Sequence, residues 1–273
     1  MRSLDDEHPG DAAGGMGTVS SLDVPGASSN QALARGLYVL RRLVESPRPM
    51  SATELAKELG LHQSSISRVM ATLGEAGYVR KNERGQFVPD YGVITLAAET
   101  TRLPLLTRPV PVFRALLEKY PTITVTTAML WRSEMLYLVR SNSGSIVHTY
   151  EYHGYALNAS APGLRLLLDL PEDEALALLA ESRERRGWGG NPRMAPADEL
   201  STLQEARKCL DHDVLILDSW YDEGQLSGAI PVRTPEPHPV TLAIVVSDGS
   251  QTPDSLRLLL HEVRRDLEDA FSD

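Results

Sequence analysis

A chain of 273 residues, 42% of them hydrophobic, can form two domains, and its single cysteine, Cys209, excludes an intramolecular disulfide framework and fits a reducing compartment. No apolar run approaches the roughly 18 residues of a membrane span, and the acidic start lacks the apolar segment of a secretory signal, so we expect a cytoplasmic protein without membrane contact. The net charge of −10 argues against a surface that binds nucleic acid throughout.

The first 45 residues divide into an arm and a helix. Residues 1–29 are rich in Gly, Ser, Ala and Asp and lack periodicity, which predicts a disordered arm. Residues 31–45 place apolar side chains at helical spacing, at Leu33, Leu37, Leu40 and Val44. The pattern predicts a helix that supports the elements after it.

Residues 51–78 predict two short helices joined by a tight turn. Ser51 and Glu54 have the spacing of a capping box, and Gly60 ends the first helix because glycine reaches a left-handed conformation at low cost. The second helix begins near His62 or Gln63 and ends at Gly77. Its apolar residues form one stripe: Ile66, Val69, Met70 and Leu73.

The opposite face of this second helix is polar. It carries Ser64, Arg68 and Thr72, with Ser65 and Ser67 on its flanks. Short hydrogen-bonding side chains and a cation are what a helix needs to read base edges in the major groove of DNA. The two helices therefore predict a helix-turn-helix DNA reader.

A basic hairpin follows. Residues 78–81 and 86–88 predict two strands around the glycine-containing turn 82–85, and the cations Arg80, Lys81 and Arg84 suit a wing that contacts phosphates or the minor groove. A serine-rich amphipathic helix by itself is usually a plain surface helix, but these elements in this order favour DNA binding. The predicted DNA-binding residues are Ser51, His62, Gln63, Ser64, Ser65, Ser67, Arg68, Thr72, Arg80, Lys81 and Arg84.

Charge is distributed unevenly along the chain. Residues 31–92 hold nine Lys and Arg against six Asp and Glu, a net charge of +3, whereas residues 93–273 have a net charge of −9. The predicted DNA-binding region is thus locally basic. An acidic second domain would discourage indiscriminate DNA binding by the rest of the surface.

The remaining residues predict a linker and a second domain. Residues 91–103 read as a helical linker, and Pro104, Pro109 and Pro111 mark a boundary. Within residues 104–273 we expect strands at 122–131, 134–140, 146–152, 214–217, 225–232 and 240–246, and helices at 112–120, 162–169, 172–182, 198–210 and from 253. The expected domains are an arm (1–29), a winged domain (30–90), the linker and an α+β domain with an antiparallel sheet (104–273).

The segments ALARGLYVLRRL, MSATELAKELGL and SSISRVMATLGEAGYVRK resemble the IclR family of bacterial transcription regulators, and the likeness covers about residues 30 to 270. The resemblance implies a winged helix-turn-helix domain and a GAF/PAS-like mixed α/β effector-binding domain. It implies a homodimer or dimer of dimers on a pseudo-palindromic operator, with repression the commoner outcome. It implies no cofactor.

Two further stretches match the family's effector pocket: YALNASAPG (155–163) and YDEGQLSGAIPV (221–232). The effector-binding residues implied are Asn158, Ala159, Ser160, Gly163, Asp218, Ser227 and Ser247. Leu164 stands where a lysine is expected, Ser227 where family members often carry cysteine, and Val245 where a serine is expected. The departures leave open a different ligand, such as a carboxylate or aromatic metabolite, and a degenerate pocket.

The turn before residue 163 also has a physical interpretation. Amides at a helix start favour an anion, so Pro162 and Gly163 after Ser160 suggest an anion site. The simpler alternative, that Ser160 only caps the helix, is favoured for that residue. Five aromatic residues either line a pocket or, as is more usual, fill core and interface positions: Tyr150, Tyr152, Tyr155, Trp220 and Tyr221.

Other chemistries find little support. His148 with His153, and Cys209 with His212, do not make a convincing ligand set, so we expect no metal site. No nucleophile elbow, P-loop or dinucleotide fingerprint occurs, so we expect no enzyme. The rival function is a constitutive DNA-binding protein whose second domain only oligomerises. A convergent polar pocket favours a sensor, and a filled apolar one favours this scaffold.

Overall fold

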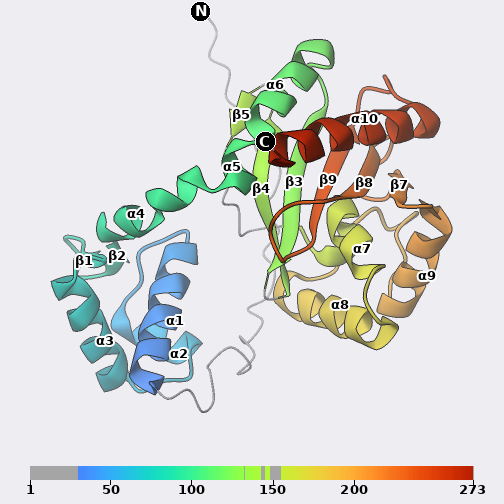
Figure 1. The fold of residues 1–273 in the computed structure, drawn as a ribbon. Helices are drawn as coiled ribbons and strands as arrows, with labels where there is room; N and C mark the ends of the chain where they lie inside the picture. Colours follow the sequence, from blue (N-terminus) through green and yellow to red (C-terminus); the bar gives the residue numbers. More distant parts are fainter. Residues whose placement is uncertain (1–29, 132, 143–144, 148–154, 273) are drawn as a thin grey trace, which may run out of the picture. The chain divides into compact units, whose positions relative to one another are not determined.

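The computed structural model of the chain describes residues 30–131, 133–142, 145–147 and 155–272 (Figure 1). They belong to two compact units that divide between Pro89 and Asp90. The predicted arm, residues 1–29, lies outside the described residues. None of the helices in the described ranges has the length and apolarity needed to cross a membrane.

The first unit contains the predicted helices and hairpin. Its elements are α1 (Gln31–Glu45), α2 (Ala52–Glu58), α3 (Gln63–Glu75), β1 (Val79–Lys81) and β2 (Phe87–Pro89). The two strands pair antiparallel, with Arg80 opposite Val88. Buried side chains from each helix form the core, among them Leu43, Leu55 and Ile66. The winged helix-turn-helix prediction is confirmed.

Local sequence explains where these helices begin and end. The Ser51 hydroxyl accepts from the Glu54 N–H at 3.1 Å, and the Glu54 carboxylate accepts from the Ser51 N–H at 2.7 Å, so the capping box is present. Gly60 and Gly77 follow α2 and α3 at φ values of +60° and +77°. A side chain at either position would be strained, which fixes the turns at glycine.

The second unit begins with short helical segments. These are α4 (Gly92–Ala97), the 3₁₀ turn Glu99–Arg102, α5 (Pro104–Thr107) and α6 (Pro109–Lys119). The interpretation of Pro104 and Pro109 as a boundary is wrong, because each proline occupies the first turn of a helix. Proline fits there because its φ suits a helix and its missing N–H needs no partner in the first turn.

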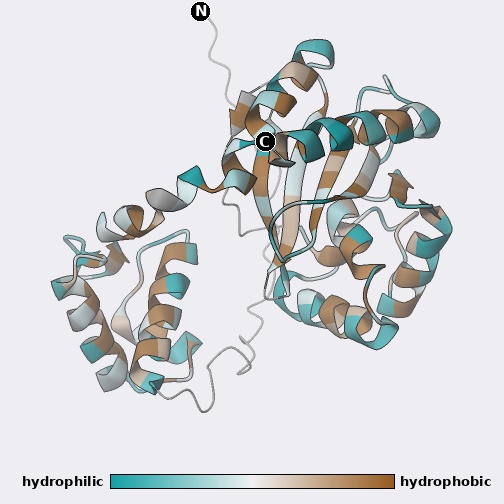
Figure 2. Ribbon diagram, viewed as in Figure 1, coloured by the Kyte–Doolittle hydropathy of each residue, from teal (hydrophilic) through white to brown (hydrophobic). Residues whose placement is uncertain are grey.

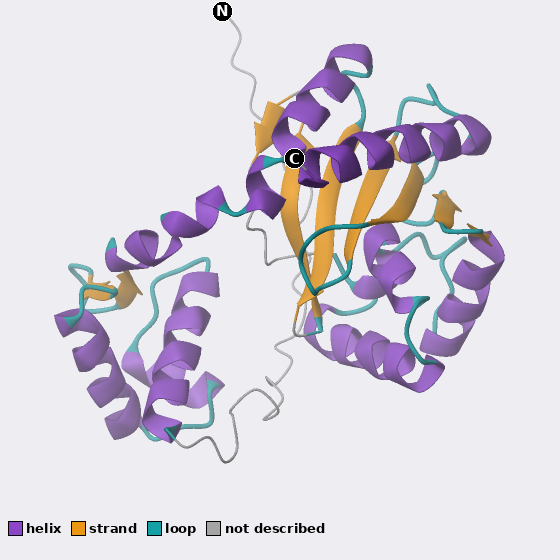
Figure 3. Cartoon of the chain, viewed as in Figure 1, coloured by secondary structure: helices purple, strands orange, loops and turns teal. Residues whose placement is uncertain are grey.

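A seven-stranded sheet forms the centre of this unit, in the order β5-β4-β3-β9-β8-β7-β6 (Figure 3). The strands are β3 (Thr124–Trp131), β4 (Glu134–Asn142), β5 (Ser145–Val147), β6 (Leu210–Asp211), β7 (Val214–Asp218), β8 (Leu226–Val232) and β9 (Val240–Val246). All neighbours are antiparallel, which confirms the α+β prediction. β6 was not predicted, and residues 148–154 of the predicted third strand lie outside the described residues.

Helices cover both faces of the sheet (Figure 1). One layer holds α6 and α10 (Pro253–Ser272), and the other holds α7 (Ala161–Leu167), α8 (Glu172–Arg186) and α9 (Glu199–Cys209). Leu242 and Ile244 of β9 pack in the α10 layer, and Ala243 packs in the α7 layer. Figure 2 shows largely apolar strands, as expected when both faces are buried.

Gly228 lets α10 approach the sheet closely. A Cβ there would lie 2.6 Å from Leu260 Cδ1 and 2.8 Å from Ile216 Cδ1. Such distances are too short for carbon atoms, so any larger residue would force the packing to shift. The requirement for glycine here comes from packing.

Candidate functional site

The predicted recognition helix, α3, has the expected two faces. Ile66 and Met70 are buried, at 0% and 1% exposure. Ser64, Arg68 and Thr72 lie on the other side of the helix and are exposed. The helix therefore presents hydroxyls and a cation to the exterior of the unit.

A groove runs between the start of α2, α3 and the hairpin. Its volume is about 570 Å³. Five of the predicted DNA-binding residues line it: Ser51, Gln63, Ser67, Arg80 and Lys81. The other six lie outside its lining: His62, Ser64, Ser65, Arg68, Thr72 and Arg84. Of these six, Ser65 is half-buried and the rest are exposed.

Some of these side chains already have local partners. The Ser51 hydroxyl caps α2, and the Thr72 hydroxyl donates to the Arg68 carbonyl at 3.2 Å. The ammonium of Lys81 lies 5.3 Å from the centre of the Phe87 ring, within the range of a cation–π contact. These contacts orient the groups and leave their outer surfaces accessible.

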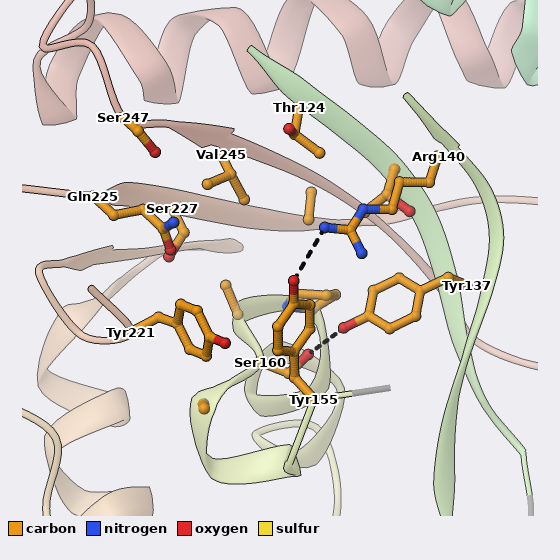
Figure 4. A pocket seen from close by; sticks show the side chains of 15 residues that line it. Thr124, Tyr137, Arg140, Tyr155, Ser160, Tyr221, Gln225, Ser227, Val245 and Ser247 are labelled. Atoms are coloured by element: carbon orange, nitrogen blue, oxygen red, sulfur yellow. Dashed lines mark hydrogen bonds between the residues drawn. The ribbon is translucent and has the colours of Figure 1, made fainter. Parts of the chain in front are cut away.

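The second unit contains a cavity of about 150 Å³ between the sheet and α7 (Figure 4). Strands β3, β4, β8 and β9 form one side, and the residues around the start of α7 form another. The lining residues are Thr124, Thr126, Tyr137, Arg140, Tyr155, Ala159, Ser160, Ala161, Pro162, Tyr221, Gln225, Ser227, Ala243, Val245 and Ser247. Most polar groups that converge here are hydroxyls.

Arg140 and three tyrosines form a cluster at this cavity (Figure 4). The guanidinium carbon lies 5.6 Å from the Tyr137 ring centre and 5.5 Å from that of Tyr155, and Nη2 donates to the Tyr155 hydroxyl at 3.3 Å. Tyr155 meets Tyr221 edge to face, with ring centres 4.9 Å apart. Cation–π and edge-to-face contacts thus hold the arginine beside the cavity.

A β-bulge directs Arg140 toward the cavity. In the pairing of β3 with β4, Ala128 lies opposite Tyr137 and Thr126 lies opposite Arg140. Two residues separate Ala128 from Thr126, but three separate Tyr137 from Arg140, so Leu138 is the extra residue. Leu138 and Val139 both pack on the α10 side. Tyr137 and Arg140 therefore share the cavity face.

Four of the seven predicted effector-binding residues line this cavity: Ala159, Ser160, Ser227 and Ser247. Asn158, Gly163 and Asp218 do not. Asn158 is buried, and its amide group bonds the Gly189 backbone at 2.7 and 3.2 Å. Asp218 is exposed and accepts from the Ser219 hydroxyl. The structure gives Asn158 a scaffolding position.

Ser160 caps α7, as the simpler interpretation holds. Its hydroxyl accepts from the Gly163 N–H at 3.2 Å and lies 3.3 Å from the Tyr137 hydroxyl. Pro162 has no N–H, so two positions of the first turn offer no amide to a ligand. The start of α7 is a weaker anion site than the sequence suggested.

Five lining residues with polar side chains were absent from the sequence prediction: Thr124, Thr126, Tyr137, Arg140 and Gln225. Tyr155 and Tyr221 line the cavity, contrary to the favoured view that such residues fill the core, whereas Trp220 is buried and donates to the Asn158 carbonyl at 2.7 Å. Tyr150 and Tyr152 lie outside the described residues. Burial, followed by Tyr155 and Asp222, raises the pKa of Tyr221, so its hydroxyl stays protonated at neutral pH.

Within the described ranges, no three His, Cys, Asp or Glu side chains are grouped as metal ligands would be. His148 and His153 lie outside those ranges. The Cys209 thiol is half-buried, and this burial raises its pKa. It is therefore a poor nucleophile at neutral pH.

Comparison with known proteins identifies the first unit. Residues 32–83 match the model of the IclR helix-turn-helix domain. A search of curated proteins gave no match. The domain match covers both helices of the motif and β1 of the hairpin.

Solved structures resemble the chain across both units. An IclR family transcriptional regulator from Brucella abortus is 24% identical, with a TM-score of 0.66 over 89% of this chain and 91% of that one. An IclR homologue from Microbacterium hydrocarbonoxydans, complexed with 4-hydroxybenzoate, is 18% identical, with a TM-score of 0.65 over 88% and 99%. The IclR transcriptional regulator of Alicyclobacillus acidocaldarius is 17% identical, with a TM-score of 0.60 over 88% and 98%.

These regulators share the fold of the second unit as well as the first. The neighbours named are transcriptional regulators, in keeping with the expectation that the chain is not an enzyme. The chain therefore carries an IclR-type helix-turn-helix domain and has the fold of the IclR family of transcriptional regulators throughout.

Proposed function

We propose that the chain is a DNA-binding regulator whose affinity for its operator is set by a small molecule in the cavity between the sheet and α7. One observation carries this proposal: hydroxyls and a guanidinium from four separate segments converge on one cavity. A scaffold that only oligomerised would have no use for such a cavity, and its interior would be filled by apolar side chains. The convergence favours a sensor over the constitutive alternative.

The proposed DNA contacts fall into two groups. Arg68 and the serines Ser64, Ser65 and Ser67 would meet base edges or adjacent phosphates, because α3 presents them on its polar face. Arg80, Lys81 and Arg84 of the hairpin would bind the phosphate backbone. The remaining predicted residues, Ser51, His62, Gln63 and Thr72, surround these two groups and would position the helix.

We also propose that two copies pair through exposed apolar residues. Leu33, Leu37 and Val44 lie on one side of α1 and are 46–59% exposed. In the second unit, Tyr91 and Ile94 at α4 are 75% and 64% exposed. Burial of such residues favours association. A two-fold pair would present two recognition helices to a pseudo-palindromic operator.

The effector is proposed to be a carboxylate or aromatic metabolite. The structural neighbour from Microbacterium hydrocarbonoxydans, complexed with 4-hydroxybenzoate, supports a small organic ligand for this fold. The polar and aromatic lining of the cavity here is compatible with such a molecule. Repression is the proposed outcome, since a dimer on an operator blocks access to the promoter.

The test is a linked binding experiment. Operator affinity is measured on the full chain by fluorescence anisotropy, with and without each of a panel of carboxylate and aromatic metabolites. Coupling must be reciprocal, so an effector that weakens DNA binding tenfold must itself bind about tenfold more weakly to the DNA complex. A metabolite that binds the protein and leaves operator affinity unchanged would contradict the sensor and favour the scaffold.

A further inference from the structure

We infer that the cavity selects a monoanionic ligand no larger than about one six-membered ring, and that Arg140 holds the anionic group. The inference rests on the proposed function, because it assumes that the cavity takes a small molecule. It goes further by assigning the charge, the size and the recognising residue.

The sign of the charge follows from the lining. Among the fifteen residues that line the cavity in the described structure, Arg140 is the only one with a charged side chain. The others supply hydroxyls, one amide, or apolar groups. Tyr221 stays protonated because burial raises the pKa of its hydroxyl, so it adds a donor and no negative charge. A cation among neutral donors favours an anion.

The position of Arg140 is built into the strand. The bulge at Leu138 turns it onto the cavity face, and the rings of Tyr137 and Tyr155 lie 5.6 and 5.5 Å from its guanidinium carbon. Figure 4 shows the guanidinium pointing from β4 toward the Tyr155 hydroxyl. An arginine held this way loses little side-chain freedom when a carboxylate arrives, and its planar fork can donate two parallel hydrogen bonds.

The start of α7 does not replace this role. Pro162 has no N–H, and the Gly163 N–H already donates to Ser160. The hydroxyls of Ser160 and Ser227 remain near the cavity as neutral partners for the rest of a ligand. The negative charge is therefore assigned to the β4 side of the cavity.

The volume limits the ligand. A buried cavity of about 150 Å³ in another protein binds benzene, and this cavity has a volume of about 150 Å³. Tyr155 and Tyr221, in edge-to-face contact, offer an aromatic wall to a planar ring. A fused two-ring acid would have to displace parts of that wall.

The experiment is isothermal titration calorimetry on the full chain with three probes: benzoate, its neutral isostere benzamide, and 2-naphthoate. We expect benzoate to bind at least about tenfold more tightly than either of the others, the size of effect typical of a hydrogen bond to a charged group. Equal affinity for benzoate and benzamide in the wild type, or no binding of benzoate, overturns the charge assignment. Binding of 2-naphthoate as tight as that of benzoate overturns the size limit.

Variants assign the residue. Arg140→Gln should abolish the preference for benzoate over benzamide, whereas Arg193→Gln, an exposed arginine outside the cavity lining, should keep it. Retention of the preference in Arg140→Gln overturns the role of Arg140. Thermal unfolding of each variant checks that it is folded, and the wild-type comparison of probes stands without any variant.

The two proposals fail separately. If benzoate binds through Arg140 and leaves operator affinity unchanged, sensing by this class of ligand fails while the recognition of an anion stands. If only neutral molecules alter operator affinity, the sensor stands and the anion assignment falls.

Discussion

The hydroxyl of Thr126 donates to the carbonyl of Val139 at 2.9 Å, where the pairing of β3 with β4 slips by one residue. A bulge removes regular ladder bonds, and this hydroxyl supplies a partner to a carbonyl at the irregularity. On the same strand pair, the Val125 N–H donates to the Ser141 hydroxyl at 2.9 Å. Two side-chain hydroxyls thus stabilise the backbone geometry that turns Arg140 toward the cavity.

Thr126→Val should weaken both the fold and the cavity. Valine matches threonine in shape but cannot donate, so the buried Val139 carbonyl loses a partner at a cost of about 1–3 kcal/mol. Because Arg140 depends on the bulge, benzoate affinity should fall severalfold in calorimetry. Thr124→Val is the matched control, since Thr124 lines the same cavity two residues away and its register partner is Val245 of β9. If the two variants unfold at the same temperature, the role given to Thr126 is wrong.

Arg84→Ala and Arg68→Ala should have different effects on DNA binding. Loss of a phosphate contact at Arg84 should reduce the slope of log affinity against log salt by about 0.9 and weaken all sequences alike. Loss of a base contact at Arg68 should cost about 1–3 kcal/mol on the operator and much less on random DNA. Both are measured by anisotropy across a salt series, with Arg193→Ala as the charge-matched control. An unchanged slope in Arg84→Ala would refute the wing contact.

Glu54 should make the first unit sensitive to acid. Hydrogen bonds from the Ser51 N–H and the Arg48 guanidinium lower the pKa of Glu54 to about 2, from an ordinary value of 4.5. A lowered pKa stabilises the fold above the unfolded-state pKa, and that stabilisation is lost as pH falls from about 4.5 toward 2. Glu54→Gln keeps a capping-box residue without a charge, so the stability difference between wild type and variant should shrink over this range. A difference that stays constant between pH 6 and pH 3 would contradict the assignment.

Gly228→Ala should destabilise the second unit by about 1–3 kcal/mol, because the added methyl group overlaps Leu260 and Ile216. Gly74→Ala provides a contrast. In α3 an added Cβ would meet only the Val79 carbonyl oxygen, at 3.7 Å, so the change should stabilise the first unit by about 0.4–1 kcal/mol. Denaturant unfolding of both variants measures these effects. Equal stability of Gly228→Ala and wild type would show that the sheet and α10 can separate without cost.

The first unit could be predicted almost completely from the sequence because its signals are local. The capping box at Ser51 and the glycines at 60 and 77 act within one helical turn of their own positions. The stripe that includes Ile66 and Met70 fixes the buried face of α3 without reference to distant residues. The two-residue strand β6 escaped because so short a segment carries no periodicity.

The cavity could be predicted only in part because its geometry is not local. Ser160 and Ser227 were found through the resemblance to a family, but Arg140 was not, since alternation from Tyr137 would place Val139 on the cavity face. The bulge that reverses this depends on packing of Leu138 and Val139 against the α10 side. Asn158 illustrates the opposite error, because only the fold brings Gly189 to its amide group.

The central claim is that α3 reads DNA under control of the cavity. The most direct measurement is the anisotropy of labelled DNA from the region flanking the protein's own gene, with wild type and Arg68→Ala, in the presence and absence of benzoate. The account predicts salt-sensitive, sequence-selective binding that Arg68→Ala loses and that benzoate shifts in the wild type. Selective binding that survives Arg68→Ala and ignores every ligand that fits the cavity would contradict it.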